Sequence, residues 1–173
     1  FGDSTTAPRP GAVEKVYAQR VAEALQGVAS SLTIHNAGIA GNTTEDALAR
    51  MGRDVLAHQP KFVVVQFGIN DSAIDVWKNP PAQEPRISLK EFEDNLRKMI
   101  TRTRTAGADP IVMTANPLRW SPKLKELYGK PPYDVSRSDG FEAPTLVRYN
   151  EIIRKLATEL RVPIVDIHKE FQQ

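Results

Sequence analysis

The hydrophobic and polar positions of the chain follow two different periods in turn. In some segments apolar residues recur three and four positions apart, which is typical of a helix with one buried face. In others they alternate or form short β-branched runs, which is typical of strands. This pattern predicts helices over residues 13–25, 43–60, 88–107 and 145–161, and strands over residues 32–36, 61–68, 110–114 and 162–168.

Two of the predicted helices also carry end signals. Thr43 has the position of an N-cap, and Ser88 with Glu91 has the spacing of a capping box. Gly107 follows the last apolar position of its segment, where a glycine often ends a helix. Local hydrogen bonding therefore favours helix starts at Thr43 and Ser88.

Strands that alternate with helices over 173 residues predict an α/β fold with a mostly parallel sheet and helices on both faces. In such sheets ligands bind outside the carboxyl ends of the strands. We therefore expect a functional site among the loops that follow the strands. These loops comprise residues 2–11, 37–43, 68–87 and 115–144 and the segment after Asp166.

The composition indicates a globular protein and excludes several kinds of functional site. A hydrophobic share of 40% and a charged share of 25% predict one globular domain over residues 1–173. The net charge of +2 gives no argument for a nucleic-acid partner, and no apolar run is long enough to span a membrane. Since cysteine is absent, a thiol nucleophile, a disulfide and a cysteine zinc site are excluded.

Two of the loops on the ligand side, residues 71–88 and 116–144, are longer than most connections and rich in proline. Aromatic residues gather in them. Two interpretations stay open: the rings stack on an apolar or sugar face of a ligand, or they form a small core that pins the loops. Trp77 and Trp120 are the candidates for substrate contact. The aromatic residues are Trp77, Trp120, Tyr128, Tyr133 and Phe141.

Three short motifs lie at strand ends, in the order "GDS", "NAGIAGN" and "GIND", and the first of them directly follows Phe1. The first offers the hydroxyl of Ser4, the second a backbone N–H at Gly41 that lacks a Cβ to shield it, and the third the side-chain amide of Asn70. Each is a weak signal alone, because such residues are common in turns and caps. A hydroxyl nucleophile with convergent N–H donors for an oxyanion is the composition of an acyl-transfer site.

The segments "FGDST", "NAGIAGNTT" and "FGIND" resemble the first three sequence blocks of the SGNH hydrolases, also called GDSL esterases and lipases. The resemblance implies a flavodoxin-like three-layer α/β/α fold and a serine esterase without metal or organic cofactor. It implies Ser4 as nucleophile, and the Ser4 N–H, the Gly41 N–H and the Asn70 side chain as the oxyanion hole. The substrate would be a small-molecule or glycan ester, with Asp3 as a further candidate contact. The form "GDST" is similar to that of carbohydrate acetylesterases in the family.

A serine nucleophile needs a base, usually histidine oriented by a carboxylate. In the family this pair is an Asp-x-x-His block after the last strand, and the register of "VPIVDIHKEF" places that block beyond Gln173. We therefore expect the base and acid outside this sequence, with His168 and Asp166 as the fallback pair. We expect His35 to fill space in the core or at the surface, and His58 to interact with the C-terminal end of a helix. Phe1 alone represents the first strand, so we expect a domain that is incomplete at both ends.

Two alternatives share the predicted fold. A Ser/Thr-rich loop after a first parallel strand can hold the phosphate of flavin mononucleotide, although Pro8 and Pro10 remove two N–H donors and "GIND" is left unexplained. The other alternative is a catalytically inactive relative that binds a glycan through the aromatic loops. The sequence contains no signal peptide, but a leader removed before Phe1 is compatible with it, as is a secreted or periplasmic location.

Overall fold

A parallel sheet forms the centre of the computed structural model, which describes residues 1–9, 11, 14–26 and 32–171. Its strands lie in the order β1-β2-β3, and both pairs are parallel, with Val64 of β1 opposite Ile111 of β2. The predicted parallel sheet is thus confirmed. The strands are β1 (Phe62–Gln66), β2 (Asp109–Met113) and β3 (Ile164–Val165).

The first residues of the chain extend this sheet beside β1. The Phe1 amino group donates to the Val64 carbonyl at 2.9 Å, and the Gln66 N–H donates to the Phe1 carbonyl at 3.0 Å. Gly2 then forms parallel bridges to Gln66 on one side and to Gly38 on the other. A Cβ on Gly2 would lie 2.7 Å from the Gln66 carbonyl oxygen, so the close approach requires glycine.

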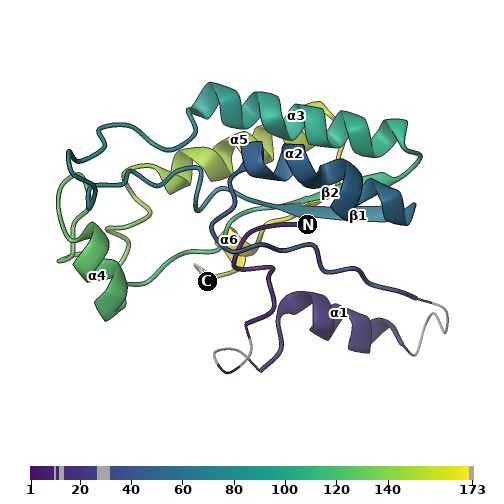
Figure 1. The fold of residues 1–173 in the computed structure, drawn as a ribbon, viewed down its shortest axis with the longest axis horizontal. Coiled ribbons are helices and arrows are strands. Elements are labelled where there is room, and N and C mark those ends of the chain that lie inside the picture. The colour runs from purple at the N-terminus through teal and green to yellow at the C-terminus, as the bar shows by residue number, and fades with distance from the viewer. Residues whose placement is uncertain (10, 12–13, 27–31, 172–173) are drawn as a thin grey trace.

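Three helices cover one face of the sheet (Figure 1). The Thr43 side chain accepts from the Asp46 N–H, and Ser88 and Glu91 form the predicted capping box. The predicted helices therefore form where their caps and periods indicate. They are α2 (Thr44–Asp54), α3 (Leu89–Thr105) and α5 (Leu146–Glu159), and the turn η1 (Leu56–His58) follows α2. The core beneath them includes Met51, Val63, Val65, Phe92, Leu96, Met99, Val112, Tyr149, Ile153 and Leu156.

The opposite face of the sheet is more open. Helix α1 (Tyr17–Leu25) lies on this side (Figure 1), and Val13, where the sequence pattern begins this helix, lies outside the described residues, as does Pro10. Along β1 the side chains alternate: Val63 and Val65 belong to the core, whereas Phe62 is 63% exposed. No described helix is both long and apolar enough to cross a bilayer.

Two strand predictions are wrong in whole or in part. Residues 32–36 have no regular structure, and Leu32 and Ile34 are exposed. A strand needs a hydrogen-bonded partner along its length, and the neighbouring Phe1–Gly2 segment offers a bridge only at Gly38. The predicted strand over residues 162–168 is reduced to β3, because Asp166 caps a short helix, α6 (Ile167–Glu170).

A further helix, α4 (Pro122–Tyr128), lies inside the segment expected to be a long loop. Its start was legible in the sequence: Ser121 caps the Leu124 N–H, and Pro122 occupies the first turn. Seven residues are too few to show a clear helical period of hydrophobic positions, so the sequence pattern predicted a loop here.

The aromatic loops form a second, smaller core beyond the carboxyl ends of the strands. For Tyr128, Tyr133 and Phe141 the packing interpretation is confirmed, since all three are buried and the rings of Tyr133 and Phe141 stack with centroids 5.0 Å apart. Trp120 packs edge-on against Phe141, and its indole N–H donates to backbone carbonyls of the same loop. Trp77 differs from them, because 46% of it is exposed.

Candidate active site

Ser4 lies at the apex of a turn that Asp3 builds. The Asp3 carboxylate accepts from the Thr5 N–H at 2.8 Å and from the Thr5 hydroxyl at 2.9 Å, and the Asp3 carbonyl accepts from the Ala7 N–H at 2.9 Å. Asp3 is buried, and burial raises the pKa of its carboxyl against the lowering effect of the Thr5 hydrogen bonds. Ser4 itself is half-buried, and no described side chain hydrogen-bonds its hydroxyl. The turn therefore presents a free hydroxyl while Asp3 is used internally.

The Ser4 turn is tied to the carboxyl end of β1. The Thr6 hydroxyl donates to the side-chain oxygen of Gln66 at 3.1 Å, and the Thr5 hydroxyl oxygen, whose hydrogen goes to Asp3, lies 3.1 Å from the same Gln66 oxygen. Gln66 is the last residue of β1 and is buried. On the other side, the Asn36 amide donates to the Thr6 carbonyl at 2.7 Å. These contacts hold the turn between β1 and the segment that leads to Gly41.

Gly41 occupies a left-handed backbone conformation, with φ +80°, on the exposed loop before α2. Non-glycine residues rarely adopt that conformation, so the glycine is required for this turn. One buried guanidinium, that of Arg50 on α2, holds the loop: it donates to the Asn42 side chain at 2.6 Å and to the Gly2 carbonyl at 3.0 Å. Arg50 thus joins the Gly41 loop to the Phe1–Gly2 segment that precedes Ser4. Sequence reasoning missed it, because an arginine on a helix ordinarily faces solvent.

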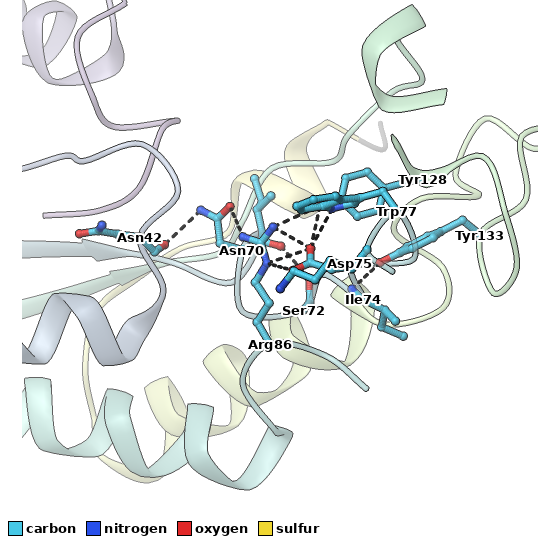
Figure 2. A network of polar contacts seen from close by, with 11 residues as sticks. Asn42, Asn70, Ser72, Ile74, Asp75, Trp77, Arg86, Tyr128 and Tyr133 are labelled. Carbon is cyan, nitrogen blue, oxygen red and sulfur yellow. Dashed lines mark hydrogen bonds and ion pairs between the residues drawn. The ribbon is translucent and has the colours of Figure 1, made fainter. Parts of the chain in front are cut away.

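Asn70 lies after β1, and its amide nitrogen donates to the Asn42 carbonyl at 3.1 Å (Figure 2). This bond brings Asn70 next to the loop of Gly41. An amide nitrogen carries two hydrogens, so one remains for another acceptor. The Ser4 turn, the Gly41 loop and Asn70 follow segments that lie side by side, because Gly2 bridges to Gly38 and to Gln66.

Asp71, next to Asn70, fastens the same edge to α2. Its carboxylate accepts from the Thr44 N–H at 2.8 Å and from the Thr44 hydroxyl at 2.5 Å. The second carboxylate oxygen is buried without a hydrogen-bond partner among the described residues. Burial raises the pKa of Asp71 to about 6, against the hydrogen bonds from Thr44 and with a smaller contribution from Asp3.

The raised pKa of Asp71 predicts a pH-dependent stability. In the unfolded chain an aspartate has a pKa of about 3.9, so between about pH 4 and 6 the folded protein binds more protons. The free energy of unfolding should therefore fall as pH rises through this range, by up to about 3 kcal/mol. Urea unfolding at a series of pH values measures it. Asp71→Asn should remove this fall, whereas Asp139→Asn, at a partly exposed carboxylate that pairs with Arg137, should keep it. Parallel curves for wild type and Asp71→Asn would contradict the assignment.

The fallback pair, Asp166 and His168, has other partners. Arg154 binds the Asp166 carboxylate at 2.8 and 3.0 Å and lowers its pKa to about 2. His168 is buried, and its ring nitrogens have no hydrogen-bond partner among the described residues. The carboxylate facing it is that of Glu142, whose oxygen lies 3.5 Å from Nε2. The two fallback residues therefore do not hydrogen-bond one another.

The remaining histidines lie together elsewhere on the surface. The rings of His35 and His58 are exposed and stack with centroids 4.1 Å apart, beside the C-terminal end of α2. Within the described residues, no three histidine, aspartate or glutamate side chains are grouped so that they would hold a metal ion. The chemistry available at the sheet edge is that of a hydroxyl and amide donors.

A parallel sheet with helices on its faces and polar loops at one edge defines a three-layer α/β protein with its candidate site at the carboxyl ends of the strands. The profile of the GDSL-like lipase/acylhydrolase family matches residues 1–173. The chain belongs to this family, which confirms the resemblance seen in the three motifs.

Individual relatives agree with that membership. The chain is 37% identical over 146 residues to an uncharacterized lipoprotein of Bacillus subtilis, YqeF, covering 82% of this chain and 57% of that protein. It is 29% identical over 168 residues to an acetylxylan esterase of Geobacillus stearothermophilus, covering 94% and 68% respectively. The chain thus spans little more than half the length of the lipoprotein.

Solved structures confirm the fold class. A crystal structure of the acetylxylan esterase Axe2 from G. stearothermophilus superimposes with a TM-score of 0.70 at 27% identity, covering 99% of this chain and 78% of that one. The acetyl xylan esterase AlAXEase gives a TM-score of 0.71 at 26% identity, covering 99% and 77%. The predicted α/β fold therefore holds over nearly all of the chain.

Proposed function

We propose that the protein hydrolyses carboxylic esters with Ser4 as nucleophile. The observation that carries the proposal is the Asn70 amide, held by the Asn42 carbonyl with one N–H free, at the sheet edge where the Ser4 turn presents its hydroxyl. The Asn70 amide and the backbone N–H groups of Ser4 and Gly41 would donate to the oxyanion.

The reaction that these groups support has two halves. Ser4 Oγ forms a bond to the acyl carbon while its proton passes to a base, and the carbonyl electron pair moves onto the oxygen that the donors face. Collapse of that intermediate expels the alcohol, which takes the proton from the base. Water then attacks the acyl-serine in the same way and releases the acid. Two assignments of the base and acid stay predictions: a pair outside residues 1–173, and the fallback pair of His168 and Asp166. The contacts between Arg154 and Asp166 give the fallback pair little support.

The substrate we propose is an acyl ester of a carbohydrate, acetyl esters first. The acetylxylan esterases to which the chain is similar support this choice. Trp77 supports it too, because its exposed ring lies on the ligand-side loop and is held by hydrogen bonds from its N–H to Asp75 and Tyr128. Similarity to a bacterial lipoprotein supports a location outside the cytoplasm.

Assays with p-nitrophenyl acetate and with acetylated xylo-oligosaccharides test the proposal. We expect release of p-nitrophenolate from the first and of acetate from the second, with both activities lost when Ser4 is replaced. A folded protein that releases neither product, or one whose activity survives the loss of Ser4, would contradict it. Hydrolysis of the p-nitrophenyl ester alone would keep the esterase and remove the carbohydrate substrate.

A further inference from the structure

The Asn70 amide can act as an oxyanion donor in only one of its two orientations. The oxygen and the NH₂ group of an asparagine side chain have nearly the same shape, so a half-turn about the last bond exchanges donor and acceptor. With the oxygen toward the site, the side chain would repel an oxyanion instead of stabilising it. Something in the surroundings must therefore select the orientation.

Two neighbours of opposite character touch the two ends of this amide (Figure 2). The Asn42 carbonyl, which can only accept, lies 3.1 Å from Asn70 Nδ2. The Arg86 guanidinium, which can only donate, has Nη1 at 3.4 Å from Asn70 Oδ1. Turning the amide over would set N–H against N–H and oxygen against oxygen, so both neighbours favour the same orientation.

The Arg86 guanidinium is itself fixed by a fork onto Asp75 (Figure 2). Its Nε lies 3.1 Å from both carboxylate oxygens, and its Nη2 lies 2.8 Å from one of them. Nη2 also donates to the Tyr128 hydroxyl at 3.2 Å. These contacts use Nε and Nη2 and leave Nη1 directed at Asn70.

Asp75 is a firm support because it is buried, ionised and bonded on several sides. It is 3% exposed, and Lys78 Nζ and the Trp77 indole N–H contact it at 2.8 and 3.2 Å. Burial alone would raise its pKa, but the hydrogen bonds from Arg86 and Lys78 overcome this and lower the pKa to about 2. The carboxylate thus stays charged at any pH at which an esterase would be assayed.

We propose that Arg86, anchored by Asp75, is a positioning residue that orients the Asn70 amide toward the oxyanion. This rests on the proposed function, because it concerns the donor that the ester hydrolysis would use. Arg86 would act through Asn70 and touch no substrate. Its loss should therefore weaken transition-state stabilisation and leave ground-state binding unchanged.

Kinetics of Arg86→Met test this against Arg97→Met, a matched control on α3. Arg97 is similarly exposed, 32% against 29% for Arg86, and is likewise paired with carboxylates, Glu93 and Glu159. We expect Arg86→Met to lower kcat about tenfold with KM within about twofold, and Arg97→Met to change neither. In an Asn70→Ala background, Arg86→Met should have no further effect on kcat. Additive losses would overturn the proposal.

Arg86→Lys separates orientation from charge. A lysine keeps the positive charge but cannot fork onto Asp75 and reach Asn70 together. We expect it to lose kcat nearly as Arg86→Met does. Full activity in Arg86→Lys would mean that a nearby charge is sufficient, and would overturn the geometric role.

A spectroscopic readout is independent of turnover. The side-chain NH₂ resonances of Asn70 are identified by their loss in Asn70→Ala, and we expect both to shift in Arg86→Met and neither in Arg97→Met. Unmoved resonances in a folded Arg86→Met protein would overturn the proposal even if ester hydrolysis were never observed. Conversely, activity that survives Ser4→Ala refutes the proposed function and leaves the orientation of Asn70 to this measurement.

Discussion

Substitution of Ser4 by alanine is expected to lower kcat for ester hydrolysis by about 10⁴-fold or more, because no acyl-enzyme can form without the hydroxyl. The fold should be little affected. Ser4 is half-buried and no described side chain hydrogen-bonds its hydroxyl, so the free energy of unfolding should change by no more than about 0.5 kcal/mol. Initial rates on p-nitrophenyl acetate, with urea unfolding of the same samples, measure both quantities.

A matched serine serves as control for this experiment. Ser136 lies in a turn in which its N–H and hydroxyl donate to Asp134, much as those of Thr5 donate to Asp3. Ser136→Ala should keep wild-type kcat. If Ser4→Ala retained activity within about tenfold of wild type, Ser4 would not be the nucleophile.

Substitution of Asn70 by alanine should lower kcat about 10²- to 10³-fold with a much smaller change in KM, as expected for the loss of one oxyanion donor. The interaction is weak in the ground state and strong in the transition state, and so the loss should fall mainly on kcat. Steady-state kinetics over a range of ester concentrations separate the two constants. Asn70→Asp should be at least as damaging, because it replaces the donor by a charge that repels the oxyanion.

The amide control lies on the same long loop. Gln83 is exposed, and its amide donates to the Pro81 carbonyl at 3.3 Å. Gln83→Ala should leave both constants near wild type. A result in which Asn70→Ala raised KM and spared kcat would place Asn70 in ground-state binding and remove it from the proposed oxyanion hole.

Helices and strands that depend on residues within their own segment were predictable from the sequence. The helix α3 begins at the Ser88–Glu91 capping box, and β1 forms within its β-branched run, as predicted. Both depend on hydrogen bonds and side-chain periods within the segment itself. Residues 32–36 show the limit of this reasoning, since their alternation was strand-like but a strand also depends on what lies beside it.

The sequence by itself determined the fold class and the family, and it predicted that Ser4, Gly41 and Asn70 share one site. Only the tertiary structure decided what holds them. Arg50 contacts the Gly2 carbonyl 48 residues away, and Arg86 contacts Tyr128 42 residues away. Neither arginine stands out in the sequence. Partners so distant are brought together by the path of the folded chain, and no local spacing encodes that path.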